Sequence, residues 1–195
     1  MTAQGWLQIA IYVAVLTALT PVLGAYMARV YQGETVVLSR VLGPLERLVY
    51  RVLGTNPERE QDWKGYAKTT IIFSALFWLA LYAILRLQSG HFFNPTDFKA
   101  APWDVTFNTT SSFITNTNWQ YYSGETTMSY LSQMAGLAVQ NFVSAGVGLA
   151  VLAAVIRGFS RRSSRTLGNF WVDLTRTTVR ILLPIAFVIA VALSA

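Results

Sequence analysis

Four long apolar segments alternate with three polar gaps along the chain. The segments cover residues 5–28, 67–88, 129–157 and 178–195. Each is close to the roughly 20 apolar residues that an α-helix needs to cross the hydrocarbon core of a bilayer. Pro21 lies inside the first segment, where a kink is tolerable because neighbouring helices can satisfy the freed carbonyl group. The pattern predicts an all-α membrane protein with four transmembrane helices.

The middle gap contains a shorter helical pattern. Residues 102–113 begin with proline and carry Asp104 in the first turn, and both features are typical of a helix start. A helix of this length spans about 18 Å, which is too short to cross the roughly 30 Å of a bilayer core. We expect this re-entrant pore helix to enter the membrane and stop, so that the chain returns as non-helical backbone through residues 115–124.

The start of this returning stretch is polar at the depth where the membrane is apolar. Thr115, Asn116, Thr117 and Asn118 follow the short helix directly. Polar backbone survives in a bilayer only where protein buries it or water lines it, and potassium filters present such backbone carbonyls to the ion. Asparagine tolerates the left-handed conformation that such a path requires. The pattern predicts a potassium site of backbone oxygens from Thr115 to Asn118, with threonine hydroxyls as additional ligands; an exposed loop is the open alternative.

The first polar gap contains an amphipathic segment. Residues 36–53 place apolar side chains at helical spacing and arginines on the opposite face, with Gly43 and Pro44 where such a helix would break. A helix of this kind lies in the membrane interface or packs against a partner subunit. The residues do not decide between the two.

Composition and charge agree with a membrane protein. Hydrophobic residues make up 53% of the chain and charged residues 12%, against about 25% charged in soluble domains. Basic residues gather in the gaps at 29–66 and 157–177, whereas the gap at 89–128 holds only Lys99. Because basic residues mark the cytoplasmic side, we expect the N-terminus to lie outside. This topology accounts for the net charge of +6, so nucleic-acid binding is rejected.

Several kinds of chemistry are excluded by the residue inventory. The chain has no cysteine, and the single histidine, His91, cannot form a histidine metal cluster. It carries no phosphate-binding loop and no aspartyl-phosphate motif. We therefore expect a non-catalytic transport subunit.

Three stretches carry a family resemblance. Residues 107–125, 130–142 and 167–176 resemble KdpA, the potassium-binding subunit of the Kdp potassium-transporting ATPase, and the resemblance extends over essentially the whole chain. It implies a potassium-channel-like unit in which an outer helix, a pore helix, a filter loop and an inner helix follow one another. The family's polypeptide carries four such units around one pore. We therefore expect an N-terminal portion of a longer subunit, from a truncated gene or an incomplete sequence.

The resemblance also implies a division of the chain into four parts. These are an N-terminal transmembrane helix at 1–30, a cytoplasmic amphipathic segment at 31–66, a first pore unit at 67–157, and a basic cytoplasmic loop with the first helix of a second unit at 158–195.

Site residues and partners are further implications of the resemblance. Asn116, Thr117 and Asn118 would line the first of four filter segments and bind a potassium ion, with Gln120 and Gly124 adjoining the filter and Gln120 tuning potassium affinity. A catalytic P-type ATPase subunit and small accessory subunits would complete the complex in the bacterial inner membrane, in contact with membrane lipid. Two alternatives remain: a membrane scaffold or assembly protein without ion conduction, and a channel formed by four copies of this chain.

Overall fold

The computed structural model describes residues 2–90, 92–120, 122–161 and 165–194; His91 lies outside these ranges. Four helices within the described ranges are long and apolar enough to cross a membrane. The fold is therefore an all-α membrane protein, which confirms the class predicted from the hydrophobic pattern. The four candidate spans are Ala3–Gln32, Trp63–Arg86, Ser132–Ser160 and Phe170–Ser194.

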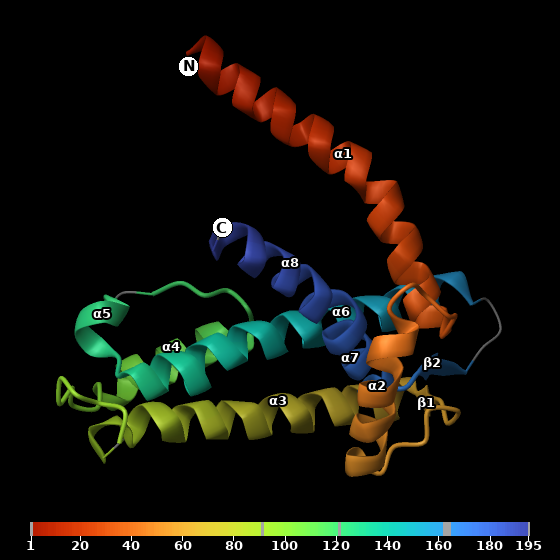
Figure 1. Cartoon of the computed structure of the whole chain (residues 1–195). Coiled ribbons are helices and arrows are strands. Elements are labelled where there is room, and N and C mark those ends of the chain that lie inside the picture. Colours follow the sequence, from red (N-terminus) through yellow and green to blue (C-terminus); the bar gives the residue numbers. More distant parts are fainter. Residues whose placement is uncertain (1, 91, 121, 162–164, 195) are drawn as a thin grey trace.

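Helix α1 (Ala3–Gln32) continues through Pro21 and diverges from the rest of the molecule toward its N-terminus (Figure 1). The Thr2 hydroxyl caps its start by accepting a hydrogen bond from the Gly5 N–H at 3.2 Å. Gly33 ends the helix in the left-handed conformation, with φ of 80°. Val30 is the helix's buried residue, so most of α1 offers its apolar surface to the surroundings.

Helix α2 (Ser39–Leu53) is continuous through Pro44, so the break expected at Gly43 and Pro44 is not found. Pro44 is exposed, and water can therefore satisfy the carbonyl group that its missing N–H leaves free. The helix packs against α7 (Phe170–Arg176) and η3 (Thr177–Leu182) of the same chain.

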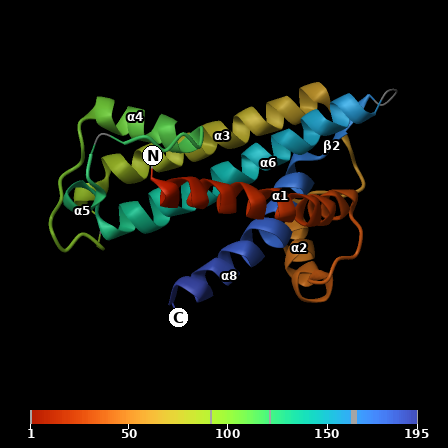
Figure 2. The same cartoon turned by 90° about the horizontal axis from the view of Figure 1, so that it is seen from above.

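The centre of the molecule is formed by α3 (Trp63–Arg86), η2 (Ser132–Ala138) and α6 (Val139–Ser160). The π-helical turns of η2 run directly into α6, and the resulting helix lies beside α3 in both views (Figures 1 and 2). The short helices η1 (Gln88–Gly90), α4 (Trp103–Ile114) and α5 (Gly124–Thr127) gather at one end.

The opposite end carries a two-stranded antiparallel sheet. Strand β1 (Gln61–Asp62) pairs with β2 (Thr166–Gly168), which joins the segment before α3 to the segment before α7. The last span begins at Phe170 as α7, continues through η3 and ends as α8 (Leu183–Ser194). The expected start at residue 178 is therefore wrong by eight residues.

Charged residues in the last span form ion pairs with residues elsewhere in the chain, which explains the misplaced boundary. Asp173 receives a bidentate pair from Arg157 on α6, at 2.6 and 2.7 Å. Arg176 and Arg180 both pair with Glu46 on α2. Because these charges are paired, the helix can include them inside the protein.

Aromatic side chains hold α3, α6 and α7 together. The Tyr66 and Phe170 rings meet edge to face, with centroids 5.7 Å apart, and Phe73 packs against Phe170 at 5.5 Å. The Tyr66 hydroxyl lies 2.7 Å from the Ala150 carbonyl oxygen and 3.0 Å from the Asp173 carboxylate. A second apolar cluster anchors the far end of the bundle and contains Leu81, Leu85, Phe113, Met128 and Leu137.

Candidate ion-binding site

Helix α4 starts at the end of the bundle where α3 ends and stops partway along α3 and α6 (Figures 1 and 2). The chain then runs back to α5 at the same end. The helix occupies Trp103–Ile114, one residue from the predicted position. The Arg86 guanidinium, at the end of α3, donates to the Ala101 carbonyl oxygen at 2.6 Å and so secures the approach to α4.

Contacts in its second half hold α4 against α3. The Trp78 indole N–H donates to the Ser111 hydroxyl at 3.1 Å, and the Phe113 side chain is buried against Leu81 and Leu85. One face of α4 is polar yet buried, through Thr106, Thr109, Thr110 and Ser112. The end of the helix is therefore held firmly inside the protein.

A turn at residues 115–118 follows α4 and directs all four of its N–H groups back at the helix. Asn116 and Asn118 have φ of 58° and 55°, in the left-handed region that asparagine tolerates. The donors reach the carbonyl oxygens of the last helical turn. They are Thr115 to Ser111 at 3.1 Å, Asn116 to Phe113 at 3.2 Å, and Thr117 and Asn118 to Ser112 at 3.0 and 3.3 Å.

The carbonyl oxygens of the same four residues are left without hydrogen bonds from the described part of the chain. Thr115, Asn116 and Thr117 are exposed, whereas two side-chain oxygens, Asn118 Oδ1 and Thr110 Oγ1, are shielded from solvent and have no partner among the described residues. Buried polar atoms without partners are costly, so a ligand or a further polar group is expected to meet them. The backbone N–H groups of the turn are therefore bonded to α4, whereas its backbone carbonyl oxygens remain available to accept a ligand.

Side chains brace the turn internally. The hydroxyl groups of Thr115 and Thr117 lie 2.6 Å apart, and Asn118 Nδ2 donates to Asn116 Oδ1 at 3.2 Å. The Ser144 hydroxyl on α6 donates to the same Asn116 oxygen at 3.2 Å. Ser144 lies twelve residues after Ser132, where the third candidate span begins, which is roughly 18 Å along the helix axis. The turn therefore contacts this span near its middle.

The two residues predicted to adjoin the site are placed differently. Gln120 is exposed and follows the turn by two positions. Gly124 instead begins α5, where its carbonyl oxygen accepts a hydrogen bond from the Gln133 side chain at 3.3 Å. The structure thus brings Thr115, Asn116, Thr117 and Asn118 together and leaves Gly124 in a separate segment.

The electrostatics of the turn favour a cation without supplying a full charge. None of the side chains at residues 115–118 is ionisable, and the described residues contain no group of three or more histidine, cysteine or acidic side chains that could hold a metal. The C-terminal end of α4 carries the negative end of the helix dipole. Nearby, burial raises the pKa of Tyr122 to about 12, so its phenol is neutral. The turn can therefore provide only uncharged oxygen atoms as ligands for a cation.

Glu125 is an ionised group in α5. Hydrogen bonds from its own backbone N–H and from the Ser123 hydroxyl hold the pKa of the Glu125 carboxyl below its ordinary value. Its side chain is in solvent, where it adds negative charge to the end of the bundle at which α4 begins.

Sequence reasoning missed two supporting residues. Ser112 provides the carbonyl oxygen on which two N–H groups of the turn converge, and its hydroxyl donates to the Trp119 carbonyl at 3.1 Å. Ser144 fastens the turn to α6. In the sequence, Ser144 lies among small residues that allow close helix packing, at positions 144–148. The Ser112 contacts lie within seven positions along the chain, whereas the contact between Ser144 and Asn116 joins separate elements and so has no local signal.

Comparisons with known proteins identify relatives. Residues 10–195 match the family model described as the potassium-transporting ATPase A subunit, KdpA. Three curated proteins named potassium-transporting ATPase potassium-binding subunit are similar to this chain. The Rhodospirillum centenum protein is 55% identical over 99% of the chain, the Sorangium cellulosum protein 55% over 99%, and the Methylobacterium radiotolerans protein 57% over 95%. The aligned regions cover 34%, 33% and 32% of these relatives, so the chain spans about a third of their length.

Proposed function

The chain belongs to the family of potassium-transporting ATPase A subunits, and from this premise we propose that its residues 115–118 bind potassium for an ATP-driven uptake pump. The observation that carries the proposal is the division of hydrogen bonding in the turn. Its N–H groups are used by α4, whereas its carbonyl oxygens have no partner from the described residues. Oxygens of this kind replace the hydration shell of potassium in selectivity filters.

The proposed chemistry is binding without covalent change. A partly dehydrated cation exchanges water oxygens for the carbonyl oxygens of the turn, and the α4 dipole favours its positive charge. A single turn surrounds an ion on one side only, and filters of this kind use four loops. We propose that the remaining ligands come from other parts of the full-length subunit. In this arrangement α3, α4 and the η2–α6 helix are the outer, pore and inner helices of one unit.

Orientation and partners form part of the same proposal. The end of the bundle that carries α2 and the β1–β2 sheet is rich in arginine, whereas α4 and the turn lie toward the opposite end. Because basic residues mark the cytoplasmic side, the site receives potassium from outside, and the N-terminus is extracytoplasmic. ATP hydrolysis belongs to a partner P-type ATPase subunit in the bacterial inner membrane, with small accessory subunits completing the complex.

The test uses the full-length subunit assembled with its partners. An Asn116→Ala substitution forces an alanine into the left-handed conformation, whereas Asn116→Gly leaves that conformation accessible. The left-handed conformation costs alanine about 1–2 kcal/mol. If potassium binding needs this conformation at residue 116, the potassium concentration for half-maximal ATPase activity rises on the order of tenfold in the alanine variant. The glycine variant shifts it less.

Asp97 provides a matched control for this experiment. It also has a positive φ, of 51°, but lies in the outer loop, where it pairs with Lys99. Asp97→Ala is expected to leave potassium dependence unchanged. Unaltered potassium dependence and unaltered discrimination between potassium and rubidium in both Asn116 variants would refute the proposed site.

A further inference from the structure

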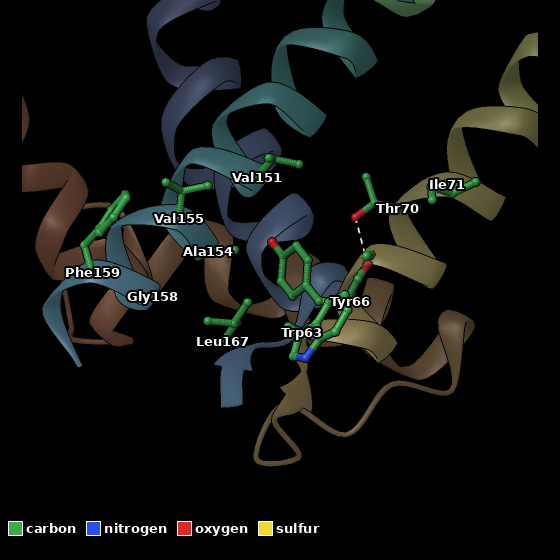
Figure 3. Close-up of a pocket in the computed structure, with 11 residues that line it drawn as sticks. Trp63, Tyr66, Thr70, Ile71, Val151, Ala154, Val155, Gly158, Phe159 and Leu167 are labelled. Atoms are coloured by element: carbon green, nitrogen blue, oxygen red, sulfur yellow. Dashed lines mark hydrogen bonds between the residues drawn. The ribbon is translucent and has the colours of Figure 1, made fainter. Parts of the chain in front are cut away.

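An apolar groove runs between α3 and α6 at the end of the bundle that carries the β1–β2 sheet. Its volume is about 520 Å³. Figure 3 shows Trp63 and Ile71 on α3, Val151 and Val155 on α6, and Leu167 on β2 around it. None of the lining residues is charged. The groove is therefore suited to a hydrocarbon chain.

The position of the groove places its mouth at the membrane surface. Trp63 is the first residue of α3, and Phe159 lies in the last turn of α6. Both side chains are exposed, by 62% and 87%. From Trp63 the groove reaches Ile71, eight positions along α3, which corresponds to about 12 Å. Tryptophan is enriched at the level of lipid headgroups, so the groove extends from that level into the bilayer.

Positive charge lies beside the mouth. The Lys64 ammonium is 5.6 Å from the centroid of the Trp63 ring, and Lys68 is one helical turn further along α3. Both lysines are exposed, and neither forms an ion pair with the described residues. In contrast, Arg157 and Arg161 at the same end are paired with Asp173 and Glu60. The lysines are therefore free to attract an anion, and the stem of Lys68 allows its ammonium to extend to the interface.

We propose that this groove binds one anionic glycerophospholipid, with an acyl chain between α3 and α6 and the phosphate at Lys64 and Lys68. The mouth of the groove is at the opposite end of the bundle from the start of α4. This lipid site needs only that the chain spans a membrane, so its test is independent of the potassium proposal.

The charges also weigh against coverage of the groove by an apolar helix from another protein segment. Such a helix would remove Lys64 and Lys68 from water without providing carboxylates, and burying an unpaired ammonium group is costly. A phospholipid avoids this cost because its phosphate remains at the level of the ammonium groups. A phospholipid also matches the groove chemically, because its acyl chain meets the apolar lining and its phosphate meets the lysines beside the mouth.

The test measures quenching of Trp63 fluorescence by lipids brominated on their acyl chains. The full-length subunit, assembled with its partners, is reconstituted with mixtures containing brominated phosphatidylglycerol or brominated phosphatidylcholine. Subtracting the signal of a Trp63→Phe variant isolates Trp63 from the other tryptophans. Each lysine is expected to favour the anionic lipid about fivefold. Half-maximal quenching by phosphatidylglycerol should therefore need a mole fraction on the order of 5- to 25-fold lower than half-maximal quenching by phosphatidylcholine.

Variants then assign the selectivity to the lysines. Lys64→Gln with Lys68→Gln is expected to remove the preference for phosphatidylglycerol, whereas Lys64→Arg with Lys68→Arg keeps it. The matched control is Arg40→Gln with Arg51→Gln, which removes two exposed charges from α2 and leaves the preference intact. Size-exclusion chromatography checks that each variant folds and assembles.

Two results would overturn the proposal. Equal quenching of Trp63 by the two lipids in the unmodified protein would mean that the groove takes acyl chains without recognising a headgroup. Absence of Trp63 quenching by either lipid would mean that protein covers the groove.

Discussion

The amide oxygen of Asn116 accepts a hydrogen bond from the Ser144 hydroxyl, 3.2 Å away, and this contact joins the turn after α4 to α6. Asn116 Oδ1 also accepts a hydrogen bond from Asn118 Nδ2, so one oxygen atom links the two left-handed residues of the turn to α6. A movement of α6 at Ser144 would therefore reach the backbone whose carbonyl oxygens we propose as potassium ligands.

Replacing Ser144 with alanine is expected to weaken potassium binding moderately. The substitution removes one hydrogen bond worth about 1 kcal/mol, which corresponds to roughly a fivefold rise in the potassium concentration for half-maximal ATPase activity. Ser123→Ala is the control, because the Ser123 hydroxyl bonds to Glu125 in the outer loop and not to the turn. Equal potassium dependence in the two variants would show that the Ser144 contact does not support the site.

Replacing Asp173 with asparagine is expected to destabilise the packing of α6 against α7. The Asp173 side chain is 1% exposed and pairs with Arg157, so the substitution leaves a largely buried guanidinium without its counter-charge. Breaking a buried pair in this way costs about 3–5 kcal/mol. Thermal unfolding of the purified subunit should show a clear fall in melting temperature.

The exposed pair between Asp97 and Lys99 provides the comparison for this substitution. Its side chains are 73% and 74% exposed, so Asp97→Asn should change stability by at most about 1 kcal/mol. Similar losses of stability in the two variants would contradict the view that burial makes the Asp173 pair important.

Glu60 is expected to add stability at neutral pH that is lost in acid. A hydrogen bond from the Thr166 hydroxyl, supported by Arg161, holds the pKa of the Glu60 carboxyl below its ordinary value of 4.5. The unfolded chain therefore binds a proton at a higher pH than the folded chain does. The contribution is complete above the ordinary pKa and disappears as pH falls through the lower, folded value.

Comparison with Glu60→Gln measures this effect. The difference in melting temperature between the parent protein and the variant should be constant from pH 7 to about pH 5.5 and shrink below pH 4.5. Thr166→Ala should reduce the same difference, because it removes the main cause of the lowered pKa. A difference in melting temperature that increases as the pH falls would contradict this explanation.

Replacing Gln88 with leucine is expected to loosen the loops at the end of the bundle that carries η1 and α5. The buried Gln88 amide donates to the carbonyl oxygens of Lys99 and Thr127, at 2.9 and 2.8 Å, and accepts from the Ser129 N–H at 2.9 Å. Leucine cannot form these three hydrogen bonds, and loss of the buried bond to the Ser129 N–H alone costs about 1–3 kcal/mol.

Hydrogen exchange checks this expectation. Protection of the backbone amide of Ser129 and of its neighbours should fall in Gln88→Leu, while α6 keeps its protection. Gln8→Leu, on the exposed face of α1, is the control and should leave the outer loops unchanged. Full protection of the Ser129 amide in Gln88→Leu would mean that the loops are held by other contacts.

The hydrophobic pattern determined the number of spans, the short helix at Trp103–Ile114 and the polar turn after it. These features are local. Span length follows from the thickness of a bilayer, and a proline followed by an acidic residue indicates a helix start within a few positions. The preference of asparagine for the left-handed region likewise made the conformations of Asn116 and Asn118 accessible to prediction.

Contacts between distant segments decided the rest. Asp173 and Arg176 lie inside the last helix because they pair with Arg157 and Glu46 on other elements. Glu46 is more than a hundred positions from Arg176, so no local sequence pattern indicates this partner. The support of the turn at residues 115–118 by Ser144 was equally undetermined, because Ser144 lies 28 positions after Asn116 and on another helix. Local composition specifies where a chain enters the membrane, whereas pairing across the fold specifies which of its polar atoms remain available to an ion.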